Sequence, residues 1–405
     1  MKYDYDIVIV GAGMAGATLA AMLTPLDLKV LLTDVEAPVP FTGGDTGVRV
    51  SALGRASARI LDAAGAWSSI VAARAAPYRA MKVWDSGSSG ELSFDAADAA
   101  LTELGWIVEN QLVQHALLER TAQSRTVRTA WRTDIEAAEF ADDAVLVKTG
   151  GRVVRCALLV GADGANSQVR ELAGIGAHAK GYGQRAVVAV VTTALPHQDT
   201  AWQRFLDGGP VALLPLPNGR CSLVWSLPDA DAARVLVLDE AAFCAELSAA
   251  IEHRLGPVTA AGPRAAFPLS RMHADEYVAP RCALIGDAAH VVHPLAGQGA
   301  NLGLLDAAAL AESLQDAVRA GATPGAWHAL RRYARWRRAH NAVMQEMLDA
   351  FHRVFMSTNP LLRSLRGAGL NAVNRLGPVK TQMVRYATGE QGDLPAAARP
   401  RAGFR

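Results

Sequence analysis

Three glycines near the N-terminus have the spacing of a phosphate-binding turn. Gly11, Gly13 and Gly16 follow the apolar run 5–10 and precede an apolar stretch that ends near Leu23. In a strand–turn–helix unit, such glycines allow a tight turn, a close approach of the backbone to a pyrophosphate, and close packing of helix on strand. The helix N-terminus adds free N–H groups and a positive dipole end. Asp34, at the end of the next apolar run, can accept hydrogen bonds from ribose hydroxyls. The pattern predicts a dinucleotide site without deciding between FAD and NAD.

Two further motifs follow short apolar runs that are typical of buried strands. The segment 160–164 reads Val-Gly-Ala-Asp-Gly, which on its own can be only a turn. The segment 284–301 places Asp287 directly after a strand, at the sheet edge where ligands bind, and an acceptor there can hold a polyol hydroxyl. Gly297 and Gly299 then open a helix, whose N–H groups and dipole would stabilise negative charge on a flavin's pyrimidine edge.

A metal site is the competing interpretation of the third motif. Asp287, His290 and His293 are spaced three apart and would share one face of a helix. Pro294 and the glycines after it argue against a helix there, and no further carboxylate is spaced to complete a ligand set. We therefore predict no metal.

The elements that must position these motifs suggest an α/β chain in which an antiparallel sheet interrupts a parallel one. The N-terminal strand–helix–strand unit opens a parallel sheet, and Pro217-Asn218-Gly219 is a hairpin signal. We expect a loop at 36–48 and helices at 50–75, 299–320 and from 331 onward. Two strands are expected within 145–154, joined at Gly150-Gly151, with further strands at 158–160, 187–194, 211–216, 220–226 and 283–285.

Composition excludes several classes of protein. The chain has 405 residues, 51% apolar and 20% charged, which indicates a globular protein of two or three domains, or of one large α/β unit, rather than a disordered one. A net charge of +1 gives no basic field for nucleic acid. Four cysteines without a CxxC pair indicate reduced thiols in a cytosol.

One charge-free stretch, residues 7–26, is long enough to span a bilayer and lies where a signal peptide would lie. Asp4 and Asp6 precede it instead of basic residues, and it contains the three spaced glycines. We interpret it as a buried strand, turn and helix.

The three motifs together resemble the single-component flavin-dependent aromatic hydroxylases, the family of p-hydroxybenzoate hydroxylase. They occur in family order as GAGMAG, GADGANSQVR and GDAAHVVHPLAGQGANLGLLD. The resemblance runs from about residue 4 to about residue 395 and is greatest to the hydroxylases of ubiquinone biosynthesis. The segments that suggest this branch are 49–53, 108–110, 202–205, 214–216 and 267–269.

The resemblance implies a Rossmann-type FAD-binding domain with a parallel sheet, an inserted, mainly antiparallel substrate domain, and a helical C-terminus. We expect the FAD-binding domain at 1–75, 101–182 and 275–340. The substrate domain is expected at 76–100 and 183–274, and the C-terminal helical region and tail at 341–405.

The cofactors that the resemblance implies are bound FAD, transient NAD(P)H and O2. The chain has no second GxGxxG, so NAD(P)H would bind in the cleft. Asp34 stands where glutamate is common, and Asn110 where relatives often have arginine or glutamine. Asp163 matches a position that serves FAD and the nicotinamide, and Asp287 matches the ribitol ligand. By motif position the FAD-binding residues are Gly11, Ala12, Gly13, Met14, Ala15, Gly16, Asp34, Arg49, Asn110, Asp163, Gly164, Gly286, Asp287, Pro294, Gly297, Gln298, Gly299, Ala300 and Asn301.

The substrate that the resemblance implies is a small, lipophilic aromatic, such as a polyprenyl phenol or quinol, held between flavin and inserted sheet. Phe205, Leu214 and Trp225 are the candidate substrate contacts. Because the cofactor does the chemistry, no catalytic triad is required. His293, beside Pro294 of the flavin wall, is the candidate catalytic base, and a structural histidine is the alternative.

Two other functional classes remain open on the sequence. A flavoprotein dehydrogenase, reductase or halogenase could share the first motif, although the third motif and the absence of a Trp-x-Trp-x-Ile-Pro segment disfavour them. A flavin-bearing, non-catalytic component of a biosynthetic complex is the other possibility.

The C-terminal region has an apolar helical stripe followed by a basic segment. Residues 356–389 contain no Asp or Glu. The stripe either packs on the FAD domain or, with the basic face, attaches peripherally to an anionic membrane. We expect a cytoplasmic protein, peripheral to the inner membrane or in a biosynthetic complex, with no nucleic-acid partner and an undecided oligomeric state. The stripe is Met344, Met347, Leu348, Phe351, Val354 and Phe355, and the basic residues are Arg363, Arg366, Arg375, Lys380 and Arg385.

Overall fold

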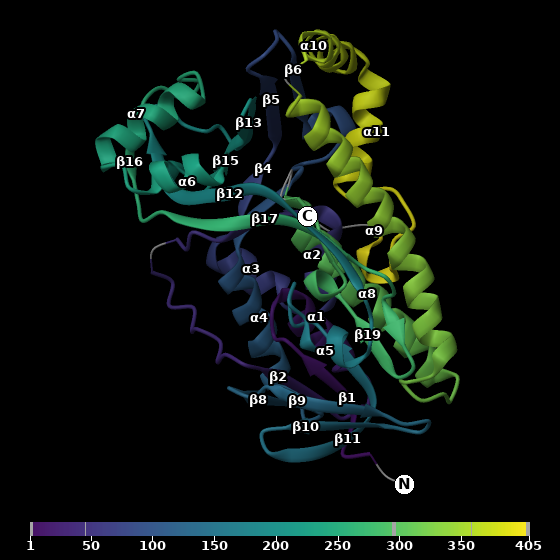
Figure 1. Ribbon diagram of the computed structural model, residues 1–405. Coiled ribbons are helices and arrows are strands. Elements are labelled where there is room, and N and C mark those ends of the chain that lie inside the picture. The colour runs from purple at the N-terminus through teal and green to yellow at the C-terminus, as the bar shows by residue number, and fades with distance from the viewer. Residues whose placement is uncertain (1–2, 45, 294–296, 358, 402–405) are drawn as a thin grey trace.

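The computed structural model describes residues 3–44, 46–293, 297–357 and 359–401, and two large sheets dominate it (Figure 1). The first sheet has the order β18-β19-β11-β1-β2-β8, and β1, β2, β8, β11 and β19 pair in parallel. Its strands are β1 Tyr5–Val10, β2 Val30–Asp34, β8 Val127–Trp131, β11 Arg152–Gly161, β18 Val278–Ala279 and β19 Cys282–Leu284, with β9 Ile135–Phe140 and β10 Val145–Thr149 extending β11.

Helices cover this sheet because its strands are buried and apolar. Residues 7–10 of β1 are buried, and α1 packs against both α4 and α8. The helices concerned are α1 Met14–Leu23, α4 Asn110–Ala122 and α8 Gln298–Arg319. The charge-free run 7–26 thus folds as β1 and α1, as we expected. In the part of the chain that the structure describes, no helix is both long and apolar enough to cross a membrane.

The second large sheet is mainly antiparallel and has the order β20-β17-β12-β15-β14-β13-β5-β6. Only β13 and β5 pair in parallel among its described strands. The strands are β5 Ala80–Asp85, β6 Glu91–Asp95, β12 Ala177–Thr193, β13 Thr200–Leu206, β14 Gly209–Pro215, β15 Arg220–Pro228, β16 Val258–Ala261, β17 Ala265–Ala274 and β20 His290–Val291. The hairpin expected at 217–219 joins β14 to β15.

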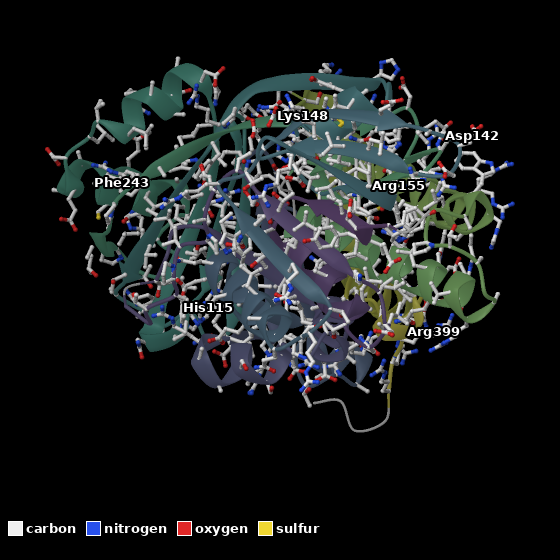
Figure 2. All side chains as sticks on the ribbon, turned by 90° about the horizontal axis from the view of Figure 1, so that it is seen from below. His115, Asp142, Lys148, Arg155, Phe243 and Arg399 are labelled. Carbon is white, nitrogen blue, oxygen red and sulfur yellow. The ribbon has the colours of Figure 1, made fainter. Side chains whose placement is uncertain are left out.

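Two helices, α6 Asp229–Leu236 and α7 Glu240–Ala250, close a separate core on one side of this sheet. Phe243 of α7 belongs to that core. Figure 2 shows Phe243 at one end of the molecule, with Asp142 and Arg155 of the first sheet's outer side at the other. The first and third motifs follow strands β1 and β19 of the parallel sheet.

The C-terminal helices are α9 Trp327–Phe355, α10 Pro360–Arg375 and α11 Gly377–Ala387. They run along one flank of the molecule, and α10 crosses from α9 to α11 beside β6 (Figure 1). The mixed α/β fold with a parallel sheet, an antiparallel sheet and a helical C-terminus confirms the expected fold class.

Two expectations about local structure were wrong. Residues 50–54 form strand β3, not a helix, because they pair with β7 Gly105–Glu109, which also pairs with β4 Ala76–Tyr78. The helices α2 Arg55–Ala63 and α3 Trp67–Arg74 follow. The strand expected to end at residue 154 and the one expected at 158–160 are a single strand, β11. It begins in the hairpin with β10 and continues beside β1.

Candidate functional site

The N-terminal glycine turn is held against the loop that follows β11. Gly11 has φ +100°, and a Cβ there would lie 2.2 Å from the carbonyl oxygen of Ala162. A Cβ on Gly16 would lie 1.9 Å from the carbonyl oxygen of Gly11. Only glycine fits at either position, so these two residues pack the turn onto the sheet.

Gly13 differs from its two neighbours because its surroundings are open. No described atom lies within 4 Å of the position that its Cβ would take. Gly13 is the N-cap of α1, and no side chain of the described residues caps that helix. The first-turn N–H groups, including those of Met14 and Ala15, are therefore available to an anion at a positive helix end. An open glycine before uncapped amides fits the pyrophosphate of FAD.

Asp34 makes two hydrogen bonds to backbone N–H groups. Its Oδ2 accepts from Ala12 over 2.7 Å, and its Oδ1 accepts from Glu36 over 3.0 Å. The carboxylate therefore shapes the glycine turn. Each carboxylate oxygen can accept another bond, so the ribose contact stays a prediction.

The third motif is anchored from beneath by Asp306, whose role the sequence analysis missed. Its Oδ2 accepts from the Gly286 N–H over 3.1 Å and lies 2.5 Å from His290 Nε2. Its Oδ1 accepts from Arg337 Nε over 2.8 Å and from Asn341 Nδ2 over 3.0 Å. Asp306 is fully buried, and burial alone would raise its pKa, but His290 and Arg337 lower the pKa below the usual value. The signal that the sequence offered for Asp306 was its place as a single acidic residue at the end of the apolar third motif.

Asp287 follows Gly286 of this network in the chain but is not itself buried. Its side chain is exposed, yet desolvation by the surrounding protein raises its pKa above the usual value. The positive charges of His290 and Arg49 lower the pKa and offset only part of that rise. The carboxylate is therefore open to a ligand at the carboxyl end of the sheet. Gly286 has φ +60°, and a Cβ there would come within 3.1 Å of the Ala15 Cβ. The first and third motifs therefore meet at this point, as a shared cofactor site requires.

The start of α8 is fastened to β3 and α2 by Asn301. Its Oδ1 accepts from the Gly54 N–H over 2.9 Å and from the Ser57 hydroxyl over 2.6 Å. Its Nδ2 donates to the carbonyls of Ala52 over 2.9 Å and of Gly297 over 3.1 Å. The side chain thus uses its full bonding capacity to hold the loop, which makes it a positioning group.

The helix start itself has the geometry expected of a backbone-lined site. Gly297 is the left-handed N-cap of α8, and no side chain among the described residues caps it. Gln298, Gly299 and Ala300 form the first turn and are partly buried. Pro294, predicted at the flavin wall, lies outside the described residues.

Arg49 and Asn110 lie together where β3 meets β7. The Arg49 guanidinium is 4.9 Å from the centroid of the Phe267 ring, and the Arg49 carbonyl accepts from the Asn110 N–H over 3.1 Å. Asn110 Oδ1 also accepts from the Ser51 hydroxyl over 2.7 Å. Both predicted residues line the main cleft.

Asp163 has a structural role in the second motif. Its Oδ1 accepts from the Ser167 hydroxyl over 2.6 Å and its Oδ2 from the Val169 N–H over 3.0 Å, which orders the start of α5 Gln168–Leu172. Gly164 beside it has φ +82° and open surroundings. The contact of Asp163 with FAD or the nicotinamide stays a prediction.

A cleft of about 550 Å³ runs from the start of α8 to the C-terminal helices, bounded by the second sheet. Phe205 of β13 and Leu214 of β14 line it, and their contact with substrate stays a prediction. Trp225 does not line it, and this prediction was wrong. Side chains alternate along β15, so Val224 and Ser226 face the cleft while Trp225 packs in the core with α6 and α7.

His293 does not have the properties of a base. It is 1% exposed, and neither ring nitrogen has a hydrogen-bond partner among the described residues. Burial, with the adjacent His352 ring at 4.7 Å, lowers the pKa of His293 to about 3. An imidazole with this pKa holds a proton too weakly for efficient base catalysis at neutral pH, so the structure supports the structural alternative.

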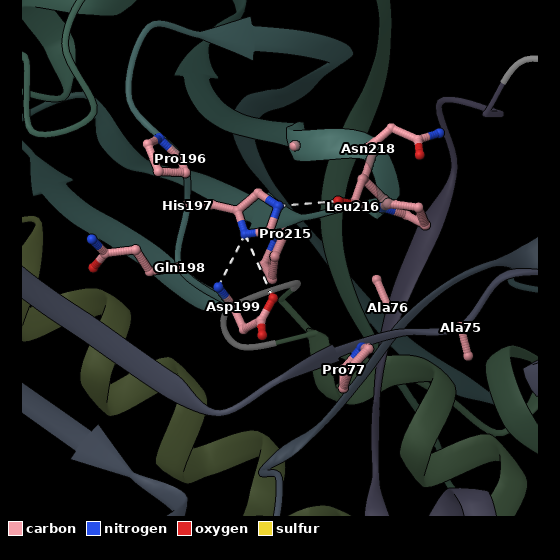
Figure 3. Close-up of a pocket in the computed structure, with 12 residues that line it drawn as sticks. Ala75, Ala76, Pro77, Pro196, His197, Gln198, Asp199, Pro215, Leu216 and Asn218 are labelled. Atoms are coloured by element: carbon pink, nitrogen blue, oxygen red, sulfur yellow. Dashed lines mark hydrogen bonds and ion pairs between the residues drawn. The ribbon is translucent and has the colours of Figure 1, made fainter.

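A second hollow, of about 430 Å³, lies between the start of β13 and the β14–β15 turn (Figure 3). His197 is its one imidazole among the described lining residues. Asp199 N–H donates to His197 Nδ1 over 3.1 Å, so Nε2 carries the proton and donates to the Leu216 carbonyl, also over 3.1 Å. Because both ring nitrogens are used in hydrogen bonds to the backbone, we assign the hollow no chemistry.

Comparison with known proteins agrees with this geometry. A family model described as "FAD binding domain" matches residues 4–347. The 3-demethoxyubiquinol 3-hydroxylase of Escherichia coli K12 is 40% identical over 388 residues, covering 95% of this chain and 98% of that protein. The human mitochondrial ubiquinone biosynthesis monooxygenase COQ6 is 34% identical, covering 95% and 92%.

Solved structures show the same fold. PqsL of Pseudomonas aeruginosa has a TM-score of 0.75 at 25% identity, covering 91% of this chain and 99% of that one. The p-nitrophenol 4-monooxygenase PnpA of Pseudomonas putida has a TM-score of 0.78 at 20% identity, covering 97% and 100%. The glycine turn, the exposed Asp287 beside it and these relatives together place the chain in the family of FAD-dependent aromatic hydroxylases that contains the ubiquinone-biosynthesis monooxygenases.

Proposed function

We propose that this protein hydroxylates the aromatic ring of a polyprenyl phenol or quinol intermediate of ubiquinone biosynthesis, using NAD(P)H and O2 with bound FAD. The observation that carries the proposal is the cleft. It begins at the uncapped start of α8, where the flavin is expected, and continues between the second sheet and the C-terminal helices. The names of the relatives supply the substrate class.

The lining of the cleft suits a molecule with a polar head and an apolar tail. Arg49 and Asn110 supply polar groups at the end near α8. Leu348 and Phe355 of α9 supply apolar walls at the other end, with Phe205 stacked on Phe355 at 3.9 Å between ring centroids. Apolar walls with a few polar groups at one end are typical of ligand sites that fix orientation.

The chain's own residues bind and shield the reactants. Bound FAD supplies the redox chemistry, which is the uptake of a hydride from NAD(P)H and the activation of O2. The backbone around Gly13 would hold the pyrophosphate, and Asp287 would accept a bond from the ribitol chain. The N–H groups at the start of α8 would stabilise negative charge on the flavin ring. The apolar walls exclude water from the reacting ring.

We further propose that the protein works in the cytoplasm at the periphery of the inner membrane, or with other proteins of the same pathway. The lipophilic quinols in the relatives' names support this placement.

Isotope labelling tests the function. The purified holoprotein is given NADPH or NADH, ¹⁸O2 and a short-chain prenyl phenol, and the product is analysed by mass spectrometry. We expect substrate-stimulated NAD(P)H oxidation and one ¹⁸O atom in the product. Label from water, or turnover without O2, would indicate another flavoprotein activity, and bound FAD without turnover would indicate the non-catalytic role.

A matched pair of variants links that activity to the cleft. Ala212 of β14 lines the cleft, and Ala137 of β9 is exposed on the first sheet. Ala212→Trp should raise the KM or abolish turnover while FAD stays bound, because the indole fills the cleft. Ala137→Trp should leave turnover unchanged. Equal activity of the two variants would remove the cleft from the proposal.

A further inference from the structure

Exposed apolar side chains gather on the three C-terminal helices. On α9 they recur every three or four residues, and the sequence around α11 shows the same spacing. Their exposed fractions run from 37% at Met383 to 67% at Val343. We call this set the C-terminal apolar face. It consists of Val343, Met347, Phe351 and Val354 of α9, Leu362 and Leu365 of α10, and Leu376, Val379, Met383 and Tyr386 at α11.

The C-terminal apolar face surrounds the open end of the cleft. Four side chains both line the cleft and are exposed to solvent. They are Met347 and Phe351 of α9, and Met383 and Tyr386 of α11. A side chain can be both only at a mouth. Figure 1 shows α9 and α11 on the same flank, joined by α10, which contacts both. An apolar cavity therefore opens through an apolar rim, where a soluble enzyme usually has polar residues.

The charge around this face is smaller than the sequence alone suggests. Arg366 is buried in a two-pronged ion pair with Asp85 at 2.7 and 2.8 Å. Arg363 pairs with Asp207 at 2.6 Å.

Lys380 is also paired, with Asp98 at 3.0 Å. Arg375 and Arg385 are exposed, and neither has an ion pair among the residues that the structure describes. Peripheral attachment through the basic residues therefore stays a proposal, and it would depend mainly on Arg375 and Arg385 together with the exposed apolar side chains.

We propose that the C-terminal apolar face docks on an anionic lipid bilayer, so that the cleft opens into the membrane. This inference rests on the proposed function, because a quinol with an isoprenoid tail dissolves in the bilayer rather than in water. A bilayer accepts apolar side chains from several helices without a matching shape. The absence of acidic residues from 356–389, with Arg375 and Arg385 free to meet lipid phosphates, favours an anionic surface.

Vesicle binding by the holoprotein tests the proposal. Phosphatidylcholine vesicles with and without phosphatidylglycerol are sedimented, and the bound flavin is measured. We expect binding that requires phosphatidylglycerol and weakens with salt. The variant Leu365→Gln/Val379→Gln should reduce the bound fraction by about tenfold or more, because each change removes a side chain that would enter the apolar layer. Neither residue lines the cleft.

Matched control variants separate the face from general surface effects. Val153 is 63% exposed and Val237 82% exposed, and both lie away from the C-terminal helices. Val153→Gln/Val237→Gln should bind vesicles as the unchanged protein does. Arg375→Gln/Arg385→Gln should remove the salt-sensitive part of binding.

Three results would overturn the proposal. In the first, the unchanged protein stays in the supernatant with anionic vesicles while a short, water-soluble substrate is still hydroxylated. The function then stands and the docking surface does not. The control variant would overturn it by losing as much binding as the face variant. A dimer that sedimentation velocity shows only in the unchanged protein would assign the face to a second copy of the chain.

Discussion

Replacing Asp306 with asparagine should destabilise the protein far more than a change of one atom suggests. Asp306 and Arg337 have fully buried side chains, and the carboxylate is the ion-pair partner of the guanidinium. The substitution leaves the Arg337 charge in the interior without its counter-charge. It also places an amide where Oδ2 now accepts from Gly286 and His290.

The expected magnitude follows from that burial. Breaking a buried pair by removing one partner costs about 3–5 kcal/mol, so the free energy of unfolding should fall by that amount. Because the Gly286 N–H loses its acceptor next to Asp287, FAD should bind more weakly as well. The pKa of Asp306 is lower in the folded chain than in the unfolded one. Its stabilising effect is therefore complete above about pH 4 and is lost as the pH falls further.

Urea unfolding of the holoprotein, followed by circular dichroism at a fixed excess of FAD, measures the loss. The double variant Asp306→Asn/Arg337→Met removes the stranded charge. It should be about 1–3 kcal/mol more stable than the sum of the two single losses predicts. The control is Asp316→Asn, which removes one of the two acidic partners of the exposed Arg332 and should cost less than about 1 kcal/mol.

Two outcomes would refute this reasoning. A loss for Asp306→Asn as small as that of Asp316→Asn would mean that the buried carboxylate does not carry the charge we assign to it. Strict additivity in the double variant would mean that the two side chains do not stabilise one another.

Three further predictions concern the cofactor site and the core. Gly13→Val should abolish FAD binding while circular dichroism stays native, because its Cβ meets no described protein atom, whereas Gly16→Val should unfold the turn; retained flavin in Gly13→Val would reduce the motif to a packing turn. Asp287→Ala should weaken FAD binding by about 1.5–3 kcal/mol in a fluorescence titration, and an unchanged affinity would remove Asp287 from the site. Burial raises the pKa of Cys156 and of Cys221 to about 12, so these thiols should resist a thiol reagent at pH 8 until the chain unfolds, and rapid native labelling of either would contradict their burial.

The sequence predicted those parts of the site that depend on local pattern. The glycine turn, the strand before Asp287 and the helix after Gly297 follow from neighbours within a few residues, and the structure has all three. Leu214 lies in a strand that the sequence predicted, whereas Phe205 was chosen from the family-like segment 202–205, and both line the cleft. Trp225 does not, since the face of a strand depends on register, and a change of one residue reverses it.

What the sequence missed depends on distant partners. Arg366 looks like a solvated charge until Asp85, far away in the chain, pairs with it. Asp306 looks like the end of a motif until Arg337 and Asn341 arrive from another helix. Composition and spacing contain no information on such pairs, because only the folded chain brings them together.

The strand order of the parallel sheet also determines how late in synthesis the sheet can be completed. β1 lies between β2 and β11, and β11 completes its pairing only with β19, at Cys282–Leu284. At a ribosome rate of about 5–20 residues per second, the apolar N-terminal strand waits roughly 14–55 s for its sheet to close. Until then the edge of β11 that pairs with β19 and the face of α1 that packs against α8 are open to wrong partners. We therefore expect the nascent chain to depend on chaperones, and to acquire its cofactor only after most of its length has left the ribosome.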